Sequence, residues 1–278
     1  MNRSQSVTSS HADIINVSGY RFVELQHLPV LQADMHAALA NIGVKGTVLL
    51  ADEGINAALA GTEQQINAVR DWFSRDERFS HLWLKQSPSG ELPFSKLKVK
   101  IRREIITFQP NDKNPVSPAT HPAPTISPQQ VRKWLETNES FTLLDTRNTY
   151  EVESGTFDTA QHLQLNTFRD FTKAVTDAVE AGDIDPSQPV VTFCTGGIRC
   201  EKAAPWMLQN GFSTVYQIEG GILNYFEHCG DAHWRGSCFV FDDRVEITPS
   251  LTPTGATLCT QCHRAIPHGH DCTCAEAV

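Results

Sequence analysis

Short apolar and alternating segments in the first hundred residues predict a domain built from β-strands and two helices. Strands are expected at 20–25, 46–51, 55–60 and 81–85, and helices at 30–42 and from Thr62 onward. Gly43 is placed to end the first helix, and Thr62 with Gln65 fits a capping box at the start of the second. A further strand is expected at 96–102. The order β-α-β-β-α-β is typical of a ferredoxin-like domain, here over residues 20–108.

Farther along, apolar strands alternate with helical segments and predict a parallel α/β domain over residues 129–232. Strands are expected at 141–145, 190–193 and 214–218, and helices from Ser127 through Trp134, after Cys200 and near Leu223. Such alternation gives a parallel sheet that is covered on both faces. Binding sites in these sheets lie beyond the carboxyl ends of the strands, where Asp145 and Cys194 both fall.

The remaining segments are interpreted as connections and ends. Residues 109–128 hold six of the fifteen prolines and predict an extended, semi-rigid linker. Residues 1–19 form a flexible lead-in without the apolar core of a signal peptide, and residues 233–278 form an extension that contains cysteines. No apolar run approaches the ~20 residues needed to cross a bilayer. We expect a cytoplasmic protein with no membrane partner, whose eight cysteines are reduced, reactive or metal-bound.

The formal net charge of −9 is unevenly distributed. Residues 1–118 hold 13 Lys and Arg against 12 Asp and Glu, whereas residues 119–278 hold 10 against 20. Five cations of the first part fall within eight residues, and we call them the basic ribbon: Lys96, Lys98, Lys100, Arg102 and Arg103. They alternate with Leu97, Val99 and Ile101, which is a strand pattern. The basic ribbon is either a track for a phosphate backbone or a solvated strand face.

The segment with the clearest chemistry is Cys194-Thr-Gly-Gly-Ile-Arg-Cys200, between a buried strand and a helix. A cysteine in this position is close to backbone amides and to the positive end of the helix dipole, which favour a thiolate. Only four residues separate Cys194 from Arg199, one fewer than cysteine-dependent phosphatases need to surround a phosphate. The loop, formed by Thr195, Gly196, Gly197 and Ile198, therefore fits a single extra sulfur better.

Other residues are candidates for supporting this loop. Arg199 adds a fixed positive charge beside the thiolate, and the glycines allow the backbone to curl. Asp145 and Arg147 either order the loop through an ion pair or cap their own strand locally. Cys200 either resolves a species formed on Cys194 or is a small packed residue. The alternative for Cys194 itself is a buried, inert cysteine.

Several motifs together carry a family resemblance. Five segments together resemble a rhodanese domain: Leu144-Asp-Thr-Arg147, Tyr150-Glu151, Gly155-Thr-Phe157, the loop from Cys194 and Val215-Tyr-Gln-Ile-Glu-Gly-Gly221. Three further segments narrow the choice of family: CTGGIRCEKA, Gly46-Thr-Val-Leu-Leu-Ala-Asp-Glu-Gly-Ile-Asn56 upstream of it, and Cys238-Phe-Val-Phe-Asp242 downstream. Over roughly residues 20–265 the chain resembles the bacterial tRNA uridine hydroxylases, oxygen-dependent enzymes that hydroxylate C5 of the wobble uridine.

The resemblance implies an acylphosphatase-like N-terminal domain, a rhodanese domain and a short cysteine-containing tail. It implies that Cys194 is the active-site cysteine, as thiolate or persulfide, that the anticodon loop of tRNA is the substrate, and that dioxygen is a co-substrate. The sequence contains no 2-His-1-carboxylate pattern and no flavin or nicotinamide fingerprint, so the electron donor is unknown. A protein that donates sulfur or electrons is an expected partner.

Two other functions stay open, and so does the role of the tail. A sulfurtransferase would move persulfide sulfur to a small molecule or to tRNA, and a rhodanese-like binding module would have no activity. In the tail, Cys259 and Cys262 form a good half-site for zinc, which Cys272 and Cys274 complete. The one-residue gap of the second pair strains such a site, and the alternative is a disordered, oxidisable tail.

Overall fold

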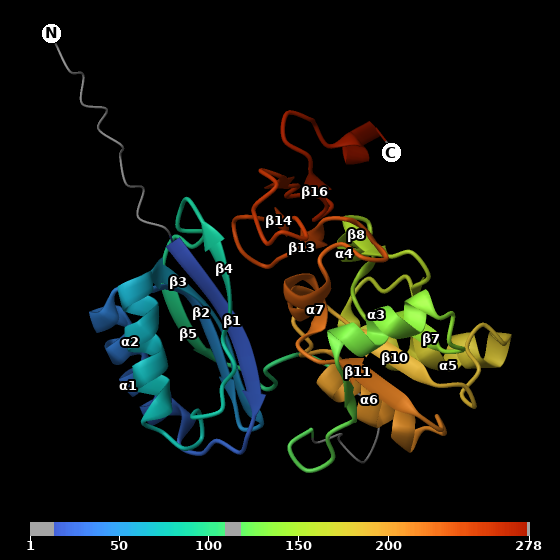
Figure 1. The fold of residues 1–278 in the computed structure, drawn as a ribbon. Helices are drawn as coiled ribbons and strands as arrows, with labels where there is room; N and C mark the ends of the chain where they lie inside the picture. The colour runs from blue at the N-terminus through green and yellow to red at the C-terminus, as the bar shows by residue number, and fades with distance from the viewer. Residues whose placement is uncertain (1–13, 109–117, 277–278) are drawn as a thin grey trace, which may run out of the picture.

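The computed structural model describes residues 14–108 and 118–276, which form two α/β domains followed by a tail (Figure 1). The N-terminal domain contains β1 (Ile14–Phe22), α1 (Leu28–Ile42), β2 (Lys45–Ala51), β3 (Gly54–Thr62), α2 (Glu63–Ser74), β4 (Lys85–Ser89) and β5 (Leu97–Ile101). The strand order in its sheet is β4-β1-β3-β2-β5, with β5 parallel to β2. Up to β4 the arrangement is the expected ferredoxin-like one, and β5 adds an edge strand.

Two strands of this sheet lie elsewhere than the sequence pattern indicated. β1 begins at Ile14, inside the segment expected to be a lead-in, and β4 spans Lys85–Ser89 instead of 81–85. Both strands carry buried polar residues, among them Asn16 and Ser87. These residues face the interior between the two domains, so the apolar and polar alternation of a surface strand is absent.

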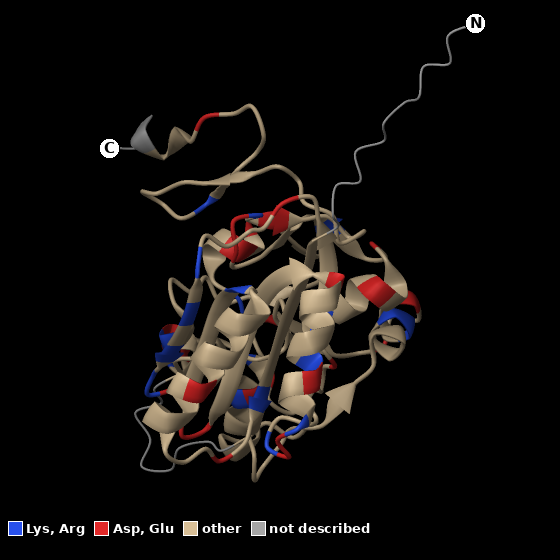
Figure 2. Ribbon diagram, turned by 90° about the vertical axis from the view of Figure 1, so that its left-hand side faces the viewer, with Lys and Arg blue, Asp and Glu red and all other residues tan. Residues whose placement is uncertain are grey.

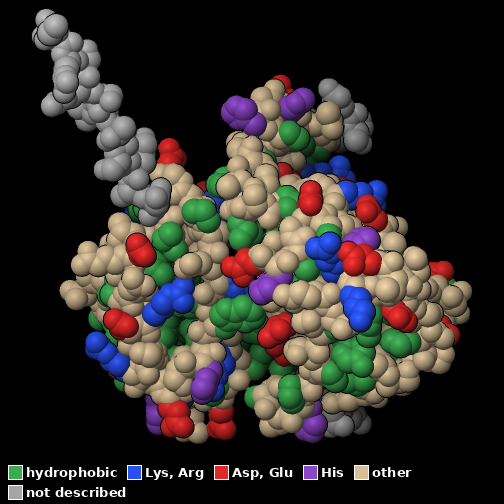
Figure 3. Space-filling view, viewed as in Figure 1, with side chains coloured by type: hydrophobic (Ala, Val, Ile, Leu, Met, Phe, Trp, Pro, Cys, Tyr) green, Lys and Arg blue, Asp and Glu red, His purple; other side chains and the backbone are tan. Residues whose placement is uncertain are grey.

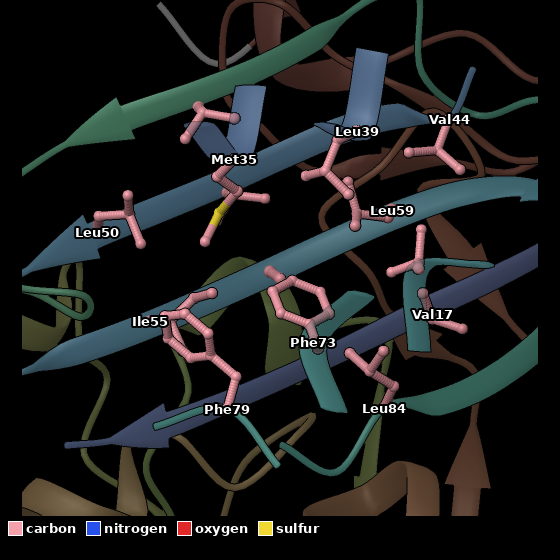
Figure 4. Packing of buried hydrophobic residues seen from close by; sticks show 14 of the residues in the cluster. Val17, Met35, Leu39, Val44, Leu50, Ile55, Leu59, Phe73, Phe79 and Leu84 are labelled. Carbon is pink, nitrogen blue, oxygen red and sulfur yellow. The ribbon is translucent and has the colours of Figure 1, made fainter. Parts of the chain in front are cut away.

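Helices α1 and α2 cover one face of the N-terminal sheet. Figure 4 shows Met35 and Leu39 of α1 and Phe73 of α2 packed over Ile55 and Leu59 of β3. The predicted capping box is present, because the Gln65 amide donates to the Thr62 hydroxyl at 3.3 Å and the Gln65 side chain accepts from the Thr62 amide at 2.9 Å. The other face of the sheet is left for the second domain.

The second domain is a parallel sheet with helices on both sides, as predicted. It contains β6 (Thr125–Ile126), α3 (Pro128–Glu136), β7 (Thr142–Asp145), α4 (Thr149–Val152), β8 (Gly155–Phe157), β9 (Gln161–His162), a 3₁₀ turn (Phe168–Asp170), α5 (Phe171–Ala181), β10 (Val190–Phe193), α6 (Cys200–Gln209), β11 (Val215–Ile218) and α7 (Gly221–Cys229). The order is β6-β11-β10-β7-β9, all parallel. β6 lies within the expected linker, of which 109–117 fall outside the described residues.

The tail packs against the second domain and contains short strands: β12 (Trp234–Gly236), β13 (Cys238–Phe239), β14 (Glu246–Ile247), β15 (Thr257–Leu258) and β16 (Ala265–Ile266), with a final 3₁₀ turn (Thr273–Glu276). β12 pairs with β8, and the Trp234 ring packs on Phe157 with ring centroids 5.0 Å apart. In the space-filling view the tail stands above the seam between the two domains (Figure 3).

An ion cluster around a buried lysine joins the two domains. Lys202 of α6 is 2% exposed, and its Nζ lies 2.9 Å from Glu53 and 2.8 Å from Glu104 of the N-terminal domain. Nζ also donates to the carbonyl of Ile106 at 3.1 Å. Removing one member of such a buried set leaves an uncompensated charge, so the cluster favours one orientation of the domains.

Candidate active site

The loop from Cys194 to Arg199 curls tightly between the end of β10 and the start of α6. The Gly197 amide donates to Cys194 Sγ at 3.2 Å, and the Cys194 carbonyl accepts from the Ile222 amide at 3.0 Å. Glycine is required at 197, where φ is +98° and a Cβ would lie 2.8 Å from the Tyr20 hydroxyl. The structure therefore brings together the loop residues named from the sequence, and the N-terminal domain touches them.

Cys194 is completely buried, yet it favours the thiolate. Burial opposes its ionisation, but a hydrogen bond from Cys200, the charge of Arg199 and the amides of Arg199 and Gly197 lower the pKa of Cys194 from 9.0 to about 5. A thiol with this pKa is almost fully ionised at neutral pH, which is the state that acts as a nucleophile.

Arg199 is held in place by a carboxylate that the sequence analysis had named only as part of a motif. Its Nη1 and Nη2 donate to Oε1 and Oε2 of Glu151 at 2.6 and 2.7 Å, and both residues are buried. The Glu151 carboxylate also accepts from the Asn148 amide at 3.1 Å, as in a capping box. In the sequence, Asn148 followed three residues later by Glu151 is a helix N-cap pattern, which indicates a local role for Glu151 but not its pairing with Arg199.

Asp145 and Arg147 form a local ion pair with one another, which is compatible with both of the expectations for them. Arg147 Nη2 lies 2.6 Å from Asp145 Oδ2, and both side chains are fully buried. Arg147 also donates to the carbonyls of Gly155 at 2.6 Å and Glu151 at 3.3 Å. The pair thus fixes the segment that carries Glu151, and a role in ordering the active loop through Glu151 stays a prediction.

Cys200 lies at the first position of α6, within hydrogen-bonding reach of Cys194. Its thiol also contacts Thr146 Oγ1 at 3.7 Å. Burial, then the hydrogen bond and negative charge of Cys194, raise the pKa of Cys200 well above its usual value. Cys200 therefore holds a proton that it shares with the Cys194 thiolate. The two side chains are thus hydrogen-bonded to one another in the observed conformation of the loop.

The N-terminal domain completes the site with residues that sequence reasoning missed. Lys85 Nζ donates to the Gly196 carbonyl at 2.8 Å and lies 4.6 Å from the centroid of the Trp83 ring. Burial lowers the pKa of Lys85 to about 8, although Cys194 and nearby carboxylates oppose this. Tyr20 donates to Glu201 at 3.1 Å. No local pattern in the sequence signals that Tyr20 and Lys85 reach across to another domain.

A cavity of about 550 Å³ opens where the two domains and the tail meet at the active loop. Cys194 and Arg199 line it from the second domain. The N-terminal sheet contributes both polar and apolar side chains, and the tail contributes an aromatic and a cationic side chain among others. These lining residues include Asn16, Ser18, Tyr20, Asn56, Ala58, Phe241 and Arg244.

The basic ribbon lies on the cavity side of the N-terminal sheet. Lys98 and Lys100 pair across the strands with Thr47 and Leu49, which line the cavity. Residues directly opposite one another on neighbouring strands share a sheet face, so both lysines flank the cavity from the edge strand β5. Of the remaining cations, Arg102 lines the cavity, and Lys96 and Arg103 are exposed at the two ends. Figure 2 shows Lys and Arg gathered along one edge of this domain.

Comparison with known proteins identifies both domains. Residues 14–105 match the family model "UPF0176 acylphosphatase like domain", and residues 127–228 match "Rhodanese-like domain". A tRNA uridine(34) hydroxylase of Bordetella petrii is 44% identical over 248 residues, which are 87% of this chain and 96% of the relative. One of Cupriavidus taiwanensis is 41% identical over 259 residues, 91% and 89% of the two chains. The chain belongs to the tRNA uridine(34) hydroxylase family.

A solved structure also aligns with this family member. The solution structure of the rhodanese-like domain from the Anabaena protein Alr3790 is 21% identical, with a TM-score of 0.35, and covers 54% of this chain and 98% of that one. Across residues 14–108 and 118–276, no helix is long and apolar enough to span a membrane.

In this tRNA uridine(34) hydroxylase family member the four tail cysteines converge. The sulfurs of Cys259, Cys262, Cys272 and Cys274 all lie within 4.8 Å of one another. Cys259 and Cys274 are 3.7 Å apart, and Cys262 and Cys272 are 3.5 Å apart. Four thiolates at about 2.3 Å from a tetrahedral zinc ion have sulfurs about 3.8 Å apart, so these residues fit the ion. The one-residue gap does not prevent convergence, because each member of the second pair meets a different member of the first.

Proposed function

We propose that this protein hydroxylates C5 of the wobble uridine, position 34, in tRNA, with dioxygen as co-substrate and Cys194 as the reactive group. The observation that carries the proposal is a thiolate in an interdomain cavity beside a cationic sheet edge. Family membership supplies the tRNA uridine as substrate. A tRNA substrate and reduced cysteines both fit the cytoplasm.

The cysteine pair can supply the electrons that such a reaction needs. Hydroxylation places one oxygen atom of dioxygen on C5 and reduces the other to water, which consumes two electrons and two protons. Oxidation of Cys194 and Cys200 to a disulfide releases two electrons and two protons, so uridine, dioxygen and two thiols give hydroxyuridine, water and a disulfide. A thiol donor from outside the chain then reduces the disulfide.

The protonation states of the two cysteines fit these roles. Cys194 provides the ionised sulfur that attacks the pyrimidine or reduces the oxygenated base, and Cys200 retains its proton until it closes the disulfide. Arg199 stabilises the thiolate, and Glu151 holds Arg199 in position. The Gly197 amide adds a hydrogen bond to the sulfur at 3.2 Å.

Recognition of RNA is proposed to use the N-terminal sheet. Single-stranded anticodon bases can be splayed away from their neighbours and inserted into a cleft. Lys98, Lys100 and Arg102 stand beside the cavity, where they would contact the phosphates that flank the inserted uridine. Such contacts contribute affinity that falls as salt concentration rises.

The tail cysteines are proposed to hold a structural zinc ion. Cys259, Cys262, Cys272 and Cys274 offer four sulfurs at suitable separations and leave no open position for a reacting molecule. Ala265, between the two cysteine pairs, packs against the buried side chains of Phe239, Val245 and Ala256. A bound ion would therefore support the tail where it meets the second domain.

The alternative is a sulfurtransferase, in which Cys194 carries a persulfide. The short loop favours it, because the Gly197 amide and Arg199 would surround one additional sulfur. The two functions are separated by mass analysis of wobble nucleosides from a strain that lacks this protein. Loss of 5-hydroxyuridine derivatives supports hydroxylation, loss of thiolated bases supports sulfur transfer, and unchanged nucleosides contradict both.

A further inference from the structure

The segment between β13 and β14, residues 240–245, forms a third wall of the cavity, which we call the tail loop. The amide of Val240 donates to the carbonyl of Val245 at 2.8 Å and closes the loop at its base. The Asp243 amide donates to the Pro93 carbonyl at 3.1 Å, and Arg244 Nη1 donates to the Ser87 hydroxyl at 2.7 Å. The tail loop is therefore anchored to the N-terminal domain beside the cavity.

Phe241 is the exposed apolar residue of this loop. It is 62% exposed, although Val240 and Val245 are buried. Its ring lies 5.8 Å from the Arg199 guanidinium and 5.4 Å from the Phe239 ring, which it meets edge to face. A single exposed apolar residue is ordinary on a protein surface. Phe241 differs from such a residue because it lines the same cavity as Cys194, and because both Phe241 and Cys194 interact with the Arg199 side chain.

A second observation in this cavity points to a ligand. Asn16 lines the cavity and is 4% exposed, and its Oδ1 has no hydrogen-bond partner. The orientation of the amide is fixed because Nδ2 donates to the Ser87 carbonyl at 3.1 Å and to Ser89 Oγ at 2.9 Å. A buried acceptor without a donor is unfavourable, and an N–H or O–H group in the cavity would satisfy it once the Asn16 side chain, whose Oδ1 is closed to solvent in this structure, shifts toward the cavity.

We propose that the tail loop forms a nucleobase subsite, in which a base of the single-stranded substrate stacks on the ring of Phe241. This inference rests on the proposed function, since it takes RNA to be the substrate. The cavity volume falls within the range of about 300–1,000 Å³ that is usual for sites of small ligands, which suits one nucleotide. A nucleobase offers a flat face to the ring, and its N–H or the ribose hydroxyls offer donors to Asn16.

The test measures the binding of a fluorescein-labelled anticodon stem-loop RNA with uridine at the wobble position, using full-length protein. Phe241→Ala and Phe241→Leu are expected to raise Kd by about 5- to 150-fold, the range given by stacking of one base. Phe241→Trp should retain wild-type affinity. The matched control is Leu258→Ala, another exposed apolar side chain of the tail that lies outside the cavity lining.

The substitutions separate stacking from packing. Leucine keeps the apolar contact but lacks a flat π-face, so wild-type affinity in Phe241→Leu would overturn the proposal, as would wild-type affinity in Phe241→Ala. Hydroxyuridine formation is measured in parallel. If wild-type protein hydroxylates tRNA and Phe241→Ala does so with an unchanged KM, only the subsite is wrong. If wild-type protein neither binds the stem-loop nor hydroxylates tRNA, the proposed function fails with it.

Discussion

Replacing Arg199 tests whether its charge keeps Cys194 ionised. The Arg199 guanidinium acts on the Cys194 sulfur through its charge, and an opposite charge at close range lowers an acidic pKa by about 1–3 units. Arg199→Met should therefore raise the pKa of Cys194 from about 5 by about 1–3 units. Each unit corresponds to about 1.4 kcal/mol of thiolate stabilisation.

The same substitution has a second effect that must be separated from the first. It leaves the Glu151 carboxylate buried without its partner, which costs about 3–5 kcal/mol when a buried pair is broken. The double variant Arg199→Met, Glu151→Gln removes both charges and should recover most of the free energy of unfolding. It should not recover the low pKa of Cys194, because the positive charge is still absent.

The assay is alkylation of Cys194 by a small haloacetamide, followed by peptide mass spectrometry from acidic to basic pH. The wild-type rate should be half-maximal near pH 5, and both variants should reach half-maximum at higher pH. Urea unfolding measures the stability of the three proteins. A half-maximal pH in Arg199→Met that equals the wild-type value would refute the role assigned to its charge.

Three further predictions concern the surroundings of the loop. Lys85→Met removes the donor to the Gly196 carbonyl and a positive charge near Cys194, so it should raise the pH of half-maximal Cys194 alkylation. An unchanged pH would contradict a role for the N-terminal domain at the site. Lys98→Gln with Lys100→Gln should weaken stem-loop binding and reduce the slope of log K against log salt by about 2. The control Lys133→Gln removes one exposed charge on α3, outside the cavity lining, and should leave the slope unchanged. Purified protein should contain about one equivalent of zinc by elemental analysis. Cys259→Ser should lose both the zinc and thermal stability. Wild-type protein in which elemental analysis finds no zinc would contradict the metal site.

Much of the fold followed from periodicity, because buried parallel strands such as 190–193 are continuous apolar runs and the capping box at Thr62 is a local signal. β1 and β4 were misplaced because polar residues such as Asn16 and Ser87 are buried in these strands and line the cavity between the domains. In the sequence alone, the polar residues of these two strands resemble those of a loop, because the sequence does not show that a second domain covers them.

The loop from Cys194 to Arg199 was predictable for the same local reason, since spacing, glycines and the strand-to-helix context lie within one heptad. Its supporting residues were not. Glu151 is 48 residues from Arg199, and Lys85 is 111 residues from Gly196, so neither contact leaves a pattern in one sequence. The spacing of the tail cysteines predicted a zinc half-site and a strained second pair, but not which sulfurs lie together. That pairing depends on how the chain between the two pairs folds.

The role of Cys194 is tested most directly by the 5-hydroxyuridine content of tRNA in a strain that lacks this protein, complemented with wild type, Cys194→Ser or Cys200→Ser. We expect that wild type restores the modified nucleoside, that Cys194→Ser does not, and that Cys200→Ser is strongly impaired because the disulfide cannot close. Immunoblotting must show equal amounts of the three proteins. Restoration of 5-hydroxyuridine by Cys194→Ser would contradict the central claim that hydroxylation depends on the Cys194 thiolate.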